Sequence, residues 1–195
     1  MGQLSRRALL ARAGAGAGAV ALFGASATPV FAAAGEADLA NVRIVCVAKR
    51  IAINWQTSWV NSPRALDTSK TADLVRSMRS QEQEHYGLLA PLLNGTAPID
   101  DDYTFVFPAG ALRSFDRAAA FALDLEELLL GIAIGAASRT NDPAVAEVLV
   151  RVVAGDGEHF AALSVLANGP ALPNGAPRAL GIEDGGNQLS QFLSY

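Results

Sequence analysis

Apolar residues recur every three to four positions in four segments of the chain, with polar residues between them. This spacing is typical of helices that bury one face. In the first segment Val42 and Val45 lie on the apolar side, and Arg43 lies opposite. The four segments span roughly residues 38–59, 67–93, 114–138 and 142–169. The pattern therefore predicts an all-α protein with four long helices.

The residues between these segments predict how the helices are connected. Asp67 is a predicted N-cap for the second helix, Asp142-Pro143 opens the fourth, and Asn168-Gly169 closes it. The first two helices, like the last two, are joined by a short loop, whereas residues 94–113 separate the second from the third. A connection of that length can cross a whole bundle. We therefore expect an antiparallel four-helix bundle with a long crossover between helices two and three.

The two ends of the chain differ in character from the helical region. Arg6-Arg7 precedes a weakly apolar Gly/Ala-rich stretch that ends in small residues, which predicts a twin-arginine signal peptide over residues 1–34, cleaved after residues 32–34. The alternative is a membrane anchor, although Pro29 and several glycines interrupt it. We expect export to the periplasm, cell wall or exterior, with no membrane attachment after cleavage. The bundle then occupies residues 35–169, and a proline-containing tail over 170–195 wraps its outside.

The composition excludes several classes of protein. The chain has one cysteine, 17% charged residues, 51% apolar residues and a net charge of −4. A single cysteine cannot form an internal disulfide framework or a thiolate metal cluster. The apolar share argues against an intrinsically disordered chain, and the acidic balance argues against a nucleic-acid partner.

An internal repeat links the second and fourth helices. Glu84-His85-Tyr86 matches Glu158-His159-Phe160 at an offset of 74 in residue number, and these are the two histidines of the chain. Each histidine follows an acid by three residues, Glu82 in the first copy and Asp156 in the second. Residues three apart share one face of a helix. Each pair thus lies on one face of its helix, and in both helices this face is the apolar stripe. A duplication of one helical hairpin would explain the matching positions.

The third helix adds an acid, Glu126, to its own apolar stripe. Several buried acids aimed at one centre repel each other unless a cation joins them. A bundle with two Glu-x-x-His helices and one Glu from each other helix is the arrangement of di-iron carboxylate proteins. In these features the chain resembles the ferritin-like superfamily, and more closely its exported, desiccation-related branch.

The resemblance implies a metal site for iron or manganese. Its predicted ligands, with aspartate as the shorter carboxylate, are Glu82, His85, Glu126, Asp156 and His159. Lys49 stands where the family has a Glu in the first helix, and Gln56 and Ala133 stand where tyrosines are common. A protonated lysine cannot bind a metal, but it can replace the charge of one ion and pair with Glu126 or Glu82. The alternative is that Lys49 extends to the surface.

Two functions remain open at this point. The first is an exported ferritin-like protein that binds iron or another divalent metal at a partly degenerate di-metal site, with oxidase activity if the site is intact. With Lys49 present, we expect the site to bind either one metal ion or none. The second is a metal-free bundle with a structural or stress-protective role. The expected partner is a metal ion, and the sequence leaves catalysis and an oligomer open.

Overall fold

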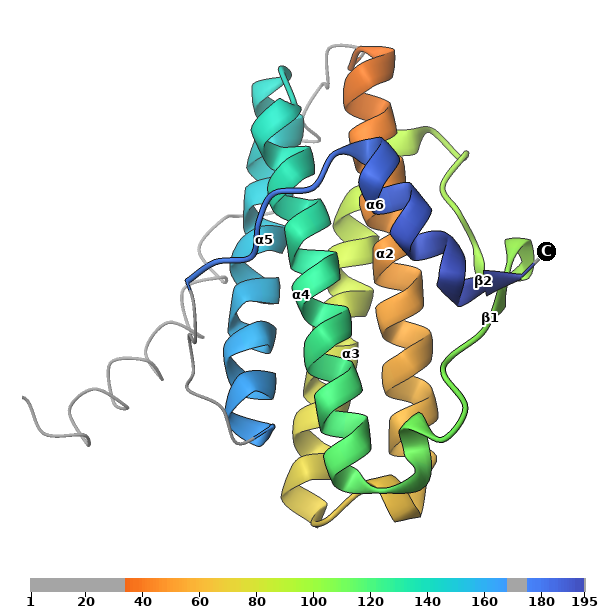
Figure 1. The fold of residues 1–195 in the computed structure, drawn as a ribbon. Coiled ribbons are helices and arrows are strands. Elements are labelled where there is room, and N and C mark those ends of the chain that lie inside the picture. The colour runs from red at the N-terminus through yellow and green to blue at the C-terminus, as the bar shows by residue number, and fades with distance from the viewer. Residues whose placement is uncertain (1–33, 168–174, 195) are drawn as a thin grey trace, which may run out of the picture. The chain divides into compact units, whose positions relative to one another are not determined.

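The computed structural model describes residues 34–167 and 175–194. Four long helices lie side by side, and a fifth, shorter helix crosses them (Figure 1). The helices are α2 (Glu36–Val60), α3 (Ser69–Leu89), α4 (Phe115–Arg139), α5 (Pro143–Leu166) and α6 (Ile182–Leu189). The all-α bundle is therefore confirmed. No helix in this part of the chain is both long and apolar enough to cross a membrane.

The connections give the bundle its predicted topology. Short links join α2 to α3 and α4 to α5, and the chain between α3 and α4 runs the length of the bundle (Figure 1). That crossover contains short 3₁₀ turns and β1 (Thr104–Phe105), which pairs antiparallel with β2 (Leu193–Ser194). The 3₁₀ turns of the crossover are Ala90–Leu93, Asp100–Asp102 and Ala111–Arg113; Pro63–Ala65 lies between α2 and α3, and Ser190–Phe192 follows α6. The crossover is thus tied to the C-terminal end of the described chain.

Of the predicted helix ends, the N-cap at Asp142 is confirmed and the N-cap at Asp67 is wrong by one residue. The Asp142 side chain accepts hydrogen bonds from the backbone N–H groups of Ala144 and Val145, as expected of an N-cap. The N-cap of α3 is Thr68, not Asp67, because the Thr68 hydroxyl accepts from the Thr71 N–H. The predicted closing pair at residues 168–169 lies outside the described residues, as do residues 1–33 of the predicted signal peptide.

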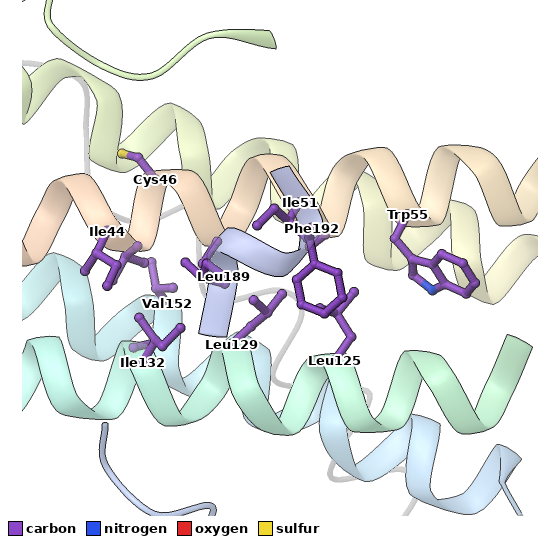
Figure 2. Packing of buried hydrophobic residues seen from close by; sticks show 14 of the residues in the cluster. Ile44, Cys46, Ile51, Trp55, Leu125, Leu129, Ile132, Val152, Leu189 and Phe192 are labelled. Carbon is purple, nitrogen blue, oxygen red and sulfur yellow. The ribbon is translucent and has the colours of Figure 1, made fainter. Parts of the chain in front are cut away.

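Residues 175–194 of the tail lie on the outside of the bundle and include α6, which the periodicity did not predict. The helix lies across α2 and α4, and Figure 2 shows Leu189 over Leu129 and Phe192, just after the helix, over Leu125. The Leu180 N–H donates to the Gly131 carbonyl oxygen over 2.9 Å. This C-terminal strap therefore covers the seam between α2 and α4.

Candidate metal centre

All four long helices bring ionisable side chains to one level in the middle of the bundle. Lys49 comes from α2, Glu82 from α3, Glu126 from α4, and Asp156 and His159 from α5. Their side chains are between 0% and 3% exposed. One ligand atom from each of the three acids and from the histidine lies within 4.8 Å of the others. The helical phases predicted from the sequence thus bring these five side chains together.

Lys49 lies inside this cluster, so the alternative of a surface-reaching lysine is wrong. Its Nζ is 2.5 Å from Asp156 Oδ2 and 2.9 Å from Glu82 Oε2. Pairing with Glu82 was expected, whereas the second partner is Asp156 and not Glu126. Burial alone would lower the pKa of Lys49, but the charges of Asp156 and Glu82 more than offset it and hold the pKa above its usual value. The ammonium is therefore charged at neutral pH.

The two glutamates in the cluster have opposite electrostatic surroundings. Burial would raise the pKa of Glu82, but the Lys49 ammonium and hydrogen bonds from both histidines hold it well below its usual range. Burial raises the pKa of Glu126 well above its usual range, and the negative charges of Glu82 and Asp156 add to the effect. Glu126 Oε1 is buried without a hydrogen-bond partner. Without a bound metal ion, Glu126 is therefore a neutral acid next to an ionised Glu82, despite the Lys49 ammonium in the same cluster.

His159 is held from both sides of its ring. Its Nε2 is 2.6 Å from Gln81 Oε1, and its Nδ1 is 3.3 Å from Glu82 Oε1. A carbonyl oxygen only accepts, so Nε2 carries the proton in the bond to Gln81. In a neutral ring Nδ1 would then point a lone pair at a carboxylate. A metal ion between Nδ1 and the acids would make this arrangement favourable.

His85, the fifth predicted ligand, lies at the edge of the cluster. Its Nδ1 is 3.4 Å from Glu82 Oε2 and 3.3 Å from Asp156 Oδ1. Burial would lower the pKa of His85, but the Asp156 and Glu82 carboxylates beside its Nδ1 raise it to about 9. His85 is therefore an imidazolium at neutral pH in the absence of a metal ion.

Sequence reasoning missed two residues that contact the histidines. Gln81 bonds to His159, and the backbone of Gly155 lies against the His85 ring. Glutamines are common on the flanks of helices, so nothing in the sequence indicated that Gln81 contacts His159. At Gly155 the helix α5 is continuous.

Comparison with known families agrees with this architecture. A family model for the ferritin-like domain matches residues 28–169, more than half of the chain. The chain belongs to the ferritin-like family. The match spans the four long helices and every residue of the cluster. No curated protein and no solved structure shows significant similarity to the chain.

Ferritin-like proteins that carry this motif hold metal ions between carboxylates and histidines, and the residues present here fit one divalent ion. When His85 is neutral, three ionised carboxylates and the Lys49 ammonium together carry a formal charge of −2, which one divalent cation balances. A second divalent ion would leave two uncompensated positive charges in a buried site. Lys49 also contacts Glu82 Oε2 and Asp156 Oδ2, whereas Glu126 Oε1 and Asp156 Oδ1 have no hydrogen-bond partner. The donors available to an ion are therefore those of a single site.

Proposed function

We propose that this ferritin-like protein binds one divalent metal ion, of the iron or manganese class, in the centre of its bundle. The supporting observation is that four donor groups meet within 4.8 Å of each other while Glu126 Oε1 and Asp156 Oδ1 lack hydrogen-bond partners. Mixed carboxylate and imidazole donors suit such ions. Lys49 takes the place of the second positive ion that other members of the superfamily hold.

Each residue has a distinct part in this proposal. Glu82, Glu126, Asp156 and His159 would hold the ion. Lys49 would neutralise one carboxylate charge and orient Glu82 and Asp156 through its two short contacts. Gln81 would hold His159 so that Nδ1 faces the acids. A bound iron ion would supply Lewis acidity and reactivity toward oxygen or peroxide, and the nearly complete burial of the cluster would exclude bulk water.

A binding titration with paired glutamate variants tests the proposal. Chelator-treated protein is titrated with Mn²⁺, which does not oxidise readily, and free Mn²⁺ is followed by electron paramagnetic resonance. We expect Glu126→Gln to weaken binding roughly tenfold or more, because it removes a charged donor. Glu127→Gln is the matched control, because Glu127 is the exposed neighbour on the same helix. Equal affinities in these two variants would contradict the assignment of Glu126.

One observation favours a second function, a metal-free bundle with a structural or stress-protective role. With Glu126 protonated, the charges of Lys49 and His85 balance those of Glu82 and Asp156, so the cluster is also neutral without an ion. Metal analysis of protein purified without chelator separates the two functions. A stoichiometric divalent metal supports the first, and its absence together with no binding of added Mn²⁺ supports the second.

The place of action belongs to the same proposal. We infer that the protein is exported by the twin-arginine route and acts in the periplasm, the cell wall or outside the cell, in the manner of the desiccation-related branch. Support comes from Arg6-Arg7 and the small residues that follow the Gly/Ala-rich stretch. This route exports folded proteins, so a metal ion could be bound before export.

A further inference from the structure

The two histidines occupy equivalent positions in the repeat but differ in exposure. The His85 side chain is 12% exposed, whereas the His159 side chain is 3% exposed. The acids and Lys49 around them are also between 0% and 3% exposed. Among the ionisable side chains of this cluster, His85 is therefore the one that reaches solvent.

The residue that faces each ring also differs between the two copies. Gln81 and Gly155 are equivalent in the 74-residue repeat. Gln81 Oε1 lies 2.6 Å from Nε2 of His159. In the other copy, Nε2 of His85 lies over Gly155, which has no side chain to bond it. His159 is thus fixed at both ring nitrogens, and His85 is held at one.

Gly155 is required for the position of the His85 ring. A Cβ at this position would lie 2.5 Å from His85 Nε2 and 2.6 Å from Cε1, closer than non-bonded atoms approach. The backbone there is ordinary α-helix, so glycine is not needed for its conformation. Gly157 is a useful contrast, because a Cβ there would meet nothing within 4 Å. Glycine within a helix costs about 1 kcal/mol relative to alanine, and at Gly155 the space it leaves is filled by the ring.

The remaining contacts of His85 are long, and the opposite side of the bundle is covered. The distances from His85 Nδ1 to Glu82 and Asp156 are 3.4 and 3.3 Å, longer than good hydrogen bonds. On the other side, α6 covers the seam between α2 and α4, where a Cβ on Gly185 would lie 2.9 Å from Ile132. In the described part of the chain, the side of the cluster that His85 faces is therefore the easier one to open.

We propose that His85 is a gate residue, whose ring swings out from Gly155 to let a divalent ion reach the acids and swings back behind it. This inference rests on the proposed function. Outward rotation breaks only the two long contacts of Nδ1 and uncovers Asp156 Oδ1, which has no hydrogen-bond partner. His159, fixed by Gln81, stays in place as a ligand. The repeat thus supplies one fixed and one moving histidine.

Stopped-flow mixing of the metal-free protein with Mn²⁺, followed by a chelator chase, tests the gate. If the His85 ring is swung out in up to about 10% of the protein molecules, removal of the ring should speed both uptake and release of Mn²⁺ roughly tenfold or more. We therefore expect His85→Ala to raise both rates and to leave Kd nearly unchanged. Gly155→Ala should act in the same direction because its methyl group displaces the ring. Gly157→Ala is the matched control and should match the parent.

The double variant shows whether Gly155 acts through His85. Once the ring is absent, Gly155→Ala should add nothing to His85→Ala. Unchanged rates in His85→Ala would overturn the gate while leaving the metal site intact. Faster release alone, with a correspondingly weaker Kd, would overturn it by showing that His85 is a ligand. Failure of the parent to bind Mn²⁺ at all would instead overturn the proposed function, and the gate with it.

Discussion

At the scale of single residues, the Lys49 ammonium sets the charge of the centre. It is fully buried and contacts Glu82 and Asp156. The sequence located Lys49 on the inward stripe and predicted a carboxylate partner, because helical phase fixes which way a side chain points. It named Glu82 as a possible partner, which is confirmed, but it did not identify Asp156 as the second partner or Gln81 as the partner of His159. Those pairings depend on side-chain rotamers and on which helices face each other across the core. The sequence of a single helix specifies neither.

Removal of the ammonium should destabilise the metal-free protein strongly. Lys49→Met retains the bulk but leaves two buried carboxylates without their cation, which costs about 3–5 kcal/mol. Added Mn²⁺ should restore more stability to this variant than to the parent, because the ion replaces the missing charge. Urea unfolding with and without Mn²⁺ measures both effects. Lys70, the other lysine of the chain, is exposed, so Lys70→Met should change stability little. A similar loss of stability in both variants would count against the buried ion pairs of Lys49.

The raised pKa of His85 predicts a pH dependence for the metal-free protein. The pKa is about 9 in the folded state against 6.5 for the free side chain. The stabilisation is therefore fully present below pH 6.5 and is lost as the pH rises through 9. The advantage of the parent over His85→Gln should shrink on the order of 3 kcal/mol across that window. Denaturant unfolding in chelator, from pH 6 to about 9.5, measures it, and a pH-independent difference would show that His85 does not gain its charge from Glu82 and Asp156.

At the scale of elements, the four long helices follow from periodicity and capping, whereas α6 does not. Its sequence, Ile182–Leu189, includes two adjacent glycines and is too short for a clear period. Packing on the bundle stabilises it: Gly185 fits against Ile132 and Ile44, and Leu189 is buried. A helix formed by tertiary packing over glycines cannot be recognised from local pattern alone.

The part of the C-terminal strap that precedes α6 packs closely against Gly135 of α4. A Cβ there would lie 1.8 Å from the Leu180 carbonyl oxygen. Gly135→Ala should therefore displace the strap, lower stability by about 1–3 kcal/mol and speed tryptic cleavage after Arg178. In Gly87→Ala the new methyl group meets nothing within 4 Å, so stability should hold or rise slightly. Parent-like cleavage of Gly135→Ala would mean that the strap does not need this contact.

At the scale of the whole molecule, topology was predictable because loop lengths limit how helices connect. Two short links and one long crossover leave few arrangements of four helices, and the ferritin-like domain match agrees with the one predicted. The export proposal belongs to this scale as well, and it rests on the sequence pattern of residues 1–34 alone. The described fold carries no record of it.

The export proposal predicts the fate of a paired substitution. Arg6→Lys with Arg7→Lys keeps the charge but removes the twin-arginine pattern, so the protein should stay in the cytoplasm at its full length. Cell fractionation and intact-mass measurement follow both properties. The parent should lose 32–34 residues on export, a range set by the small-residue sites near Ala32 and Ala34. Unchanged export of the double variant would rule out this route.

The number of divalent ions bound per chain is the quantity on which the proposed centre depends. Native mass spectrometry of metal-free protein, titrated with Fe²⁺ without oxygen, counts them for the parent and for Lys49→Glu. We predict one ion for the parent, and two for Lys49→Glu, because the substitution adds a carboxylate and removes the repelling ammonium. No ion or two ions in the parent, or the same count in both proteins, would contradict a single-ion centre balanced by Lys49.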